Sequence, residues 1–153
     1  MRVPLRSTMV VVLSATVVLG CAGKMSTPDA IAARQKLMKE QGAAMTGIQT
    51  KLKAGQHNAI GPEAEKLVST SRQIPSLFPK DSLDPATSRA KPEIWQKWAD
   101  FQGLAKSLET KSGALEKTAK SGDAQMTQTA VAELGKTTCG ACHTQFRGPE
   151  IKK

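Results

Sequence analysis

Apolar residues along this chain recur in steps of three, four and seven, which is the spacing of one face of an α-helix. No strand-like alternation of apolar and polar positions stands out. The first helix is predicted to begin at Thr27, with Pro28 at its first helical position and Asp29 beside the positive end of the helix dipole. It should end at residues 53–55. Its predicted apolar stripe consists of Ile31, Met38, Met45 and Leu52, thickened by Leu37 and Ile48.

Three further helices follow from the same pattern. One is predicted from Gly61–Pro62 to about Gln73, where Pro75 stops it, and a long irregular crossover then covers residues 74–91. The next helix opens at Pro92–Glu93 and ends near residues 121–122.

The last helix is predicted to be capped by Asp123 and to continue through Cys139 to about Phe146. Its apolar face should carry Met126, Ala130 and Leu134. Four helices with one longer connection predict an all-α, antiparallel four-helix bundle, in which cofactors bind between facing helices.

The first two dozen residues are typical of an export signal rather than of a folded domain. Arg2 and Arg6 precede an apolar stretch, residues 9–19, that is too short to span a bilayer. The run Val-Leu-Gly-Cys at 18–21 resembles a bacterial lipobox, in which Cys21 is lipidated, but ordinary signal cleavage fits equally well. We expect an export signal over residues 1–23, a bundle over 24–153, and a periplasmic protein, with a lipid anchor at Cys21 as the open alternative.

Composition adds two constraints. The chain of 153 residues has the length of one domain. Its formal charge of +9 is interpreted first as a solvated surface, and attraction to acidic proteins or anionic membrane faces is the alternative. Because no long basic run occurs and the chain carries an export signal, we expect no nucleic-acid partner. Two Trp, three Phe and no Tyr make a thin core, to which a buried porphyrin would add apolar volume.

The run Cys139-Gly140-Ala141-Cys142-His143 carries the chemistry of the sequence. Cys-x-x-Cys-His is typical of covalent haem c attachment. Two thiols one helical turn apart can add to the two vinyl groups of one porphyrin, and the imidazole of the next residue can ligate the iron. The sequence therefore predicts one covalent haem c near the C-terminal helix.

The same cysteines allow three other interpretations. A structural zinc site needs four ligands, and only His57 is left to complete one with these residues. A thioredoxin-like pair expects a βαβ setting, which the pattern lacks. A disulfide between Cys139 and Cys142 would close only a tiny loop, with little entropic gain.

Three segments together resemble the class II c-type cytochromes, the family of cytochrome c′ and cytochrome c-556. The segment Cys139-x-x-Cys142-His143 with Phe146-Arg147 is similar to the closing helix of that family. Its first helix is similar to Arg34-Gln35-x-x-Met38-Lys39, and its third to Pro92-Glu93-Ile94-Trp95. The resemblance covers roughly residues 28–151.

The resemblance implies a role for each matching residue. Cys139 and Cys142 would form the thioethers, and His143 would be the proximal iron ligand. Arg34, Gln35, Glu93 and Arg147 would then lie near the haem, with Arg34 pairing a propionate and Arg147 beside the proximal imidazole. The alternatives are solvated charges for the two arginines and a favourable helix-terminus charge for Glu93.

Met38 separates two functions within the family. It lies four residues beyond Arg34, on the same helix face, and matches the family's distal position. In the c-556 branch a Met there ligates iron, which suits electron transfer with redox partner proteins. In the c′ branch the residue covers an open site that binds nitric oxide or carbon monoxide, and a buried apolar stripe is the purely structural alternative.

We take His143/Met38 ligation and electron transfer as the working prediction. Five-coordinate gas binding is the alternative, and an exported helical binding module without haem is an alternative of another class. The chain carries no carboxylate dyad, nucleophile triad or phosphate loop, so no enzymatic activity is expected. Family members often form homodimers, and the exposed faces leave that state open.

Overall fold

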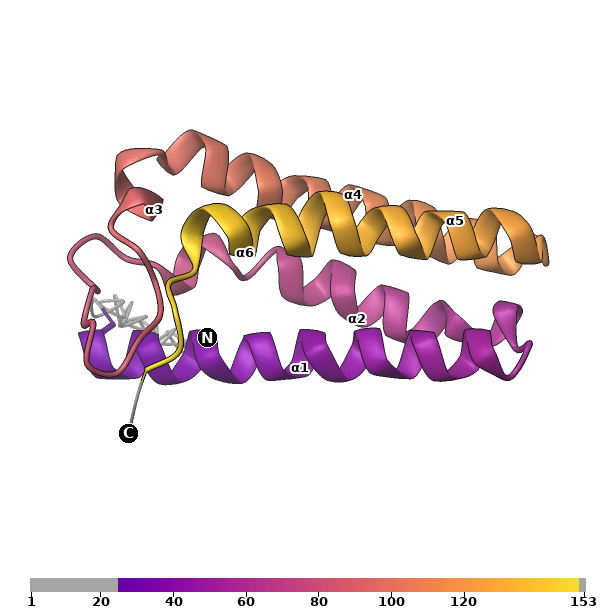
Figure 1. Cartoon of the computed structure of the whole chain (residues 1–153), viewed down its shortest axis with the longest axis horizontal. Coiled ribbons are helices and arrows are strands. Elements are labelled where there is room, and N and C mark those ends of the chain that lie inside the picture. Colours follow the sequence, from indigo (N-terminus) through magenta and orange to yellow (C-terminus); the bar gives the residue numbers. More distant parts are fainter. Residues whose placement is uncertain (1–24, 152–153) are drawn as a thin grey trace, which may run out of the picture.

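A computed structural model of the chain describes residues 25–151, which fold as a four-helix bundle (Figure 1). α1 (Thr27–Lys53) and α2 (Gly61–Ser71) form the first half, and α4 (Trp98–Lys120) begins the second. The C-terminal stretch runs through α5 (Ala124–Leu134), the π-helical turn η3 (Gly135–Gly140) and α6 (Ala141–Phe146). The predicted all-α, antiparallel four-helix bundle is confirmed.

Short elements connect these helices. η1 (His57–Ile60) joins α1 to α2, and η2 (Pro75–Leu77) is the single 3₁₀ helix of the long crossover. The crossover leads to α3 (Glu93–Gln96). Among residues 25–151 no helix is both long enough and apolar enough to span a bilayer.

Two helix starts match the sequence pattern. Ser26 caps α1 and its hydroxyl accepts a hydrogen bond from the backbone N–H of Asp29, at 3.3 Å. Asp123 caps α5 in the same way, since its carboxylate accepts from the N–H of Met126 at 2.8 Å. Capping satisfies backbone donors that have no partner inside the helix.

The predicted third helix is broken, which corrects the expectation of one helix from Pro92 to Ser121. The backbone at Lys97 leaves the helical region (φ −116°, ψ 48°) and separates α3 from α4. On α3, the indole N–H of Trp95 points to the carbonyl oxygens of Phe78 and Pro79, at 3.2 and 3.1 Å. These contacts hold α3 against the crossover, so α3 does not continue along the axis of α4.

The fourth helix is also not a uniform α-helix. Its backbone widens into the π-helical turn η3, which contains Cys139, before α6 begins. At Gly140 an added Cβ would lie 3.2 Å from the carbonyl oxygen of Gly135. The wide turn therefore depends on a glycine inside the Cys-x-x-Cys-His motif. π-helical turns are frequent at functional sites.

The apolar faces of two helices are rotated from their predicted positions. Met126 is 59% exposed, so it does not lie on the inner face of α5; the buried residues there are Thr127, Val131 and Leu134. On α1, Met38, Met45 and Leu52 are only partly buried. The deepest stripe of α1 lies beside them and consists of Ala30, Ile31, Arg34, Leu37, Gln41, Ala44 and Ile48.

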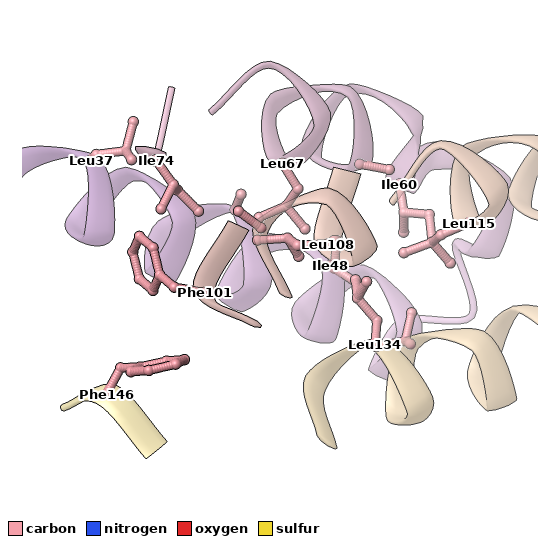
Figure 2. Packing of buried hydrophobic residues seen from close by; sticks show 14 of the residues in the cluster. Leu37, Ile48, Ile60, Leu67, Ile74, Phe101, Leu108, Leu115, Leu134 and Phe146 are labelled. Atoms are coloured by element: carbon pink, nitrogen blue, oxygen red, sulfur yellow. The ribbon is translucent and has the colours of Figure 1, made fainter. Parts of the chain in front are cut away.

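The core runs along the bundle axis (Figure 2). Ile48, Leu67, Leu108 and Leu134 meet from four different helices in its middle. Towards one end aliphatic packing gives way to aromatic rings, where Phe101 packs edge-to-face on Phe146 with centroids 5.4 Å apart. Since α1 packs mainly on α2 and the C-terminal stretch mainly on α4, this end keeps space between α1 and α6.

Candidate functional site

A cavity of about 520 Å³ lies between α1, the crossover, α4 and the C-terminal stretch. Its volume falls within the range of small-molecule and cofactor sites, about 300–1,000 Å³. Much of its wall is apolar, formed by Ile74, Phe78, Ile94, Phe101, Leu104, Ala105, Leu108 and Phe146.

The three residues of the predicted attachment motif line this cavity together. Cys139 lies in η3, and Cys142 and His143 lie in α6. Both cysteines are free thiols and half-buried. Burial, with the neighbouring Cys139 as a smaller cause, raises the pKa of the Cys142 thiol to about 11.

His143 is held in the form that binds a metal. Burial lowers the pKa of its imidazole below the ordinary value, and the positive charges of Arg147 and Arg89 add to the effect. The imidazole is therefore neutral near pH 7, with a nitrogen lone pair available. Two free thiols, a neutral imidazole and an apolar cavity on the same wall fit a covalently held haem.

Arg34 lies on α1 and is buried, at 3% exposure, while its side chain lines the cavity. It donates hydrogen bonds to Ser82 and Ser88 of the crossover, and its guanidinium carbon lies 4.9 Å from the ring centroid of Phe78. Burial lowers its pKa from the ordinary value. Within residues 25–151 no carboxylate forms an ion pair with Arg34, so an acidic group of a bound molecule would find a cation here.

Two more of the predicted residues reach the cavity. Gln35 is largely exposed, lines the rim, and donates from Nε2 to the carbonyl oxygen of Thr87 at 2.8 Å. Arg147 is exposed and lines the rim next to His143. A backbone pairing of Ala90 with Arg147 joins the crossover to the end of the chain here.

Glu93 is not part of the cavity wall; its neighbour Ile94 is. One Glu93 carboxylate oxygen lies 3.7 Å from the ammonium nitrogen of Lys91. No carboxylate lines the cavity at all among the described residues. The expected contact between Glu93 and a bound cofactor stays a prediction.

Met38 lines the cavity from α1, one turn after Arg34, and is half-buried. It therefore shares the cavity with His143, which comes from a different helix. His57 does not line the cavity; it lies in η1, where its Nδ1 is 3.0 Å from the carbonyl oxygen of Gly55. Trp95 and Trp98 also lie outside the lining.

Sequence reasoning assigned no role to five polar residues of the lining, of which Ser88 and Thr138 carry buried hydroxyls. Lys39 and Arg89 add positive charge to the rim, and Gln41 is buried at the wall. The signal for Gln41 was available, since it lies three residues after Met38 and seven after Arg34 on one helix face. Arg89 gave no such signal, because it belongs to an irregular crossover.

The family model described as Cytochrome C' matches residues 29–147. The chain belongs to the cytochrome c′ family. Members of this family carry one covalent haem c, and the chain is accordingly a monohaem c-type cytochrome.

Two relatives from Rhodopseudomonas palustris are similar to the chain over most of its length. The chain is 29% identical over 138 residues to a cytochrome c′, which covers 88% of this chain and 92% of the relative. It is 28% identical over 151 residues to a cytochrome c-556, with 92% of this chain and 97% of the relative covered. The sequence is thus similar to both branches of the family at nearly the same identity.

Solved structures share the fold. Cytochrome c′ from Thermochromatium tepidum superposes with a TM-score of 0.70 at 27% identity. The match covers 83% of this chain and 100% of the Thermochromatium chain. The nitric oxide complex of a mutant cytochrome c prime from Alcaligenes xylosoxidans gives a TM-score of 0.72 at 22% identity, with 82% of this chain and 98% of that one covered. The second likeness supports the bundle architecture.

Proposed function

We propose that this family member is a periplasmic electron-transfer cytochrome with a haem iron ligated by His143 and Met38. The observation that carries the proposal is the shared cavity: a thioether reaches it from α1, and two free thiols and a neutral imidazole reach it from η3 and α6. Haem c, when bound, supplies an iron that changes oxidation state or binds a small ligand.

The residues of the chain have separate tasks in this proposal. Cys139 and Cys142 hold the porphyrin covalently, and His143 ligates the iron. Arg34, Gln35 and Arg147 lie where they can bind the acidic edge of the cofactor, as supported by their positions in the cavity wall. Glu93 is retained as a residue near the cofactor on the strength of the family motif alone.

Met38 ligation would favour electron transfer, because an iron that keeps both ligands changes charge with little rearrangement. The apolar wall around Met38 supports this, since a thioether is a soft ligand suited to such a setting. The proposed physiological role is shuttling electrons between redox partner proteins. No catalytic turnover of an organic substrate is part of the proposal.

The second candidate function is binding of nitric oxide or carbon monoxide at a five-coordinate iron. It is supported by the family relative that was solved with nitric oxide. In that case Met38 is an apolar lid. The third interpretation, a helical module without haem, conflicts with membership of a family whose proteins carry haem c.

Location and assembly extend the proposal. The export signal over residues 1–23 and the lipid anchor at Cys21 fall outside the described residues, and both stay predictions. The bundle domain was predicted over 24–153, and the structure describes 25–151 of it. A homodimer likewise stays a prediction.

The attachment test uses protein exported from a host that matures c-type cytochromes. Wild-type protein should keep its Soret absorption after acid-acetone extraction, whereas a Cys139→Ala/Cys142→Ala variant should lose its haem. Covalent haem in the double variant, or none in the wild type, would contradict the assignment. His143→Ala should change the axial ligation, and an unchanged spectrum would point to a different ligand.

A spectrum of the resting protein then separates the two functions. Low-spin, six-coordinate ferric and ferrous spectra are expected for His143/Met38 ligation. High-spin spectra with rapid carbon monoxide binding would favour the gas-binding alternative.

A further inference from the structure

Gln41 is a buried amide in the wall of an otherwise largely apolar cavity. Its side chain lines the cavity from α1, one turn after Met38, and the residue is only 8% exposed. The lining around it includes the aliphatic side chains of Met45, Ile74 and Leu108. An amide in such a place is costly unless its hydrogen-bonding groups find partners.

One contact fixes how the amide is turned. The hydroxyl of Thr70 on α2 donates to the carbonyl oxygen of Lys66, at 2.7 Å. Its oxygen is therefore left to accept, and Gln41 Nε2 lies 3.2 Å from it. Because the hydroxyl proton is already used, the nitrogen of Gln41, and not its oxygen, must face Thr70.

The remaining groups of the amide have no partner within residues 25–151. An amide side chain can donate two hydrogen bonds and accept two, and the structure uses one donor. The second N–H and Oε1 belong to a side chain that lines the cavity. The amide is held in one orientation with a donor and an acceptor to spare.

Two other buried neutral side chains, Ser88 and Thr138, lie in the same wall. The Ser88 hydroxyl oxygen accepts from Arg34, at 2.8 Å, and from the backbone N–H of Ala90, so its lone pairs are used and its O–H has no acceptor within residues 25–151. The Thr138 hydroxyl donates to the carbonyl oxygen of Leu134. Gln41 is thus the buried amide of this lining with a free donor, and Ser88, beside the guanidinium of Arg34, is the buried hydroxyl with one.

We propose that Gln41 recognises small ligands of the cavity: its second amide N–H donates a hydrogen bond to a diatomic molecule bound on the α1 side. The inference rests on the proposed haem function, and it applies to the ferrous iron whichever resting ligation holds, because carbon monoxide can displace a thioether. Thr70 acts as the positioning residue that keeps the amide turned towards the ligand.

Carbon monoxide is the probe, bound to the ferrous holoprotein and observed by infrared spectroscopy and dissociation kinetics. A hydrogen bond to its oxygen lowers the C–O stretching frequency and slows dissociation. Gln41→Leu should raise that frequency and speed dissociation by roughly two- to tenfold, the range that one neutral hydrogen bond provides. Gln49→Leu is the matched control, because Gln49 lies on the same helix, is exposed and does not line the cavity; it should change neither quantity.

The outcomes separate this inference from the proposed function. Wild-type protein without a covalent haem spectrum would overturn both. A carbon monoxide band and dissociation rate that Gln41→Leu leaves unchanged would overturn the role of Gln41 alone. If Gln41→Leu fails to retain haem, Thr70→Val is the deciding variant. Without the hydrogen bond to Thr70 that orients the amide, the C–O stretching band should broaden. A band with the same width and frequency as in wild type would overturn the inference.

Discussion

The Nη2 atom of Arg34 lies 2.8 Å from the hydroxyl oxygen of Ser88, which joins α1 to the crossover across 54 residues of chain. The same nitrogen donates to the carbonyl oxygen of Ser82 at 2.9 Å, and Nη1 of Arg34 donates to the Ser82 hydroxyl at 3.2 Å. One buried side chain thus fixes two points of an irregular segment against a helix. The segment that it fixes contributes Ser88, Arg89 and Ala90 to the cavity wall.

Arg34→Met should loosen this wall. The substitution keeps apolar contact with Phe78 but leaves the buried Ser82 carbonyl and Ser88 hydroxyl without their charged donor. We expect the free energy of unfolding of the holoprotein to fall by about 1–3 kcal/mol. Denaturant unfolding followed by helical circular dichroism measures it.

Arg72→Met is the control for this prediction. Arg72 donates to Glu109 at 2.8 Å, but 64% of its side chain is exposed. Exposed ion pairs contribute about 0–1 kcal/mol, so this variant should be nearly as stable as wild type. Equal losses in the two variants would show that Arg34 does not act through the crossover.

Met38→Ala tests the distal position directly. With Met38 as ligand, the variant should convert a low-spin spectrum to a high-spin one, bind carbon monoxide faster and have a lower reduction potential, because thioether ligation raises the potential. Loss of a half-buried side chain should also reduce stability by about 1–2 kcal/mol. If only gas access and stability change while the coordination number stays the same, Met38 is a lid.

Gly140 and Gly135 form a matched pair within η3. A Cβ at Gly140 would lie 3.2 Å from the backbone oxygen of Gly135, whereas a Cβ at Gly135 meets nothing within 4 Å. Gly140→Ala should therefore be less stable than Gly135→Ala by about 1–2 kcal/mol, although both gain helix propensity. It should also incorporate less haem, because η3 positions Cys139 beside α6. Equal haem content and equal melting temperatures would contradict this account of the turn.

Glu109 provides a prediction of pH dependence. Lys106 and, next, Arg72 hydrogen-bond to its carboxylate and lower its pKa below the ordinary value. A depressed folded-state pKa contributes stability that is present above the unfolded-state pKa and is lost as pH falls through the folded one. Arg72→Met should raise the Glu109 pKa and move that loss to higher pH, as an NMR titration of its side-chain carboxyl would show. A Glu109 pKa that does not change in the variant would leave Lys106 as the sole cause.

The elements that depend on local sequence could be predicted from it. The start of α1 at Thr27 and the cap of α5 at Asp123 were predicted, although the cap of α1 is Ser26, which the sequence analysis did not name. The motif from Cys139 to His143 carries its chemistry in five adjacent residues. Periodicity predicted the bundle, because a helix with one apolar face must pack that face on others. The family resemblance followed from segments of this kind.

Tertiary structure decided where those faces point. Met126 is exposed and Met38 stands beside the deepest stripe, because packing selects a rotation of each helix that a short apolar pattern leaves open. The break at Lys97 arises from contacts of α3 with the crossover. The wide turn at η3 arises from the short distance between Gly140 and the backbone oxygen of Gly135. Arg34 and Gln41 gain their environments from partners on other elements, Ser88 and Thr70. The sequence determined which groups the chain carries; only the folded packing decided which of them share one cavity, because residues distant along the chain meet there.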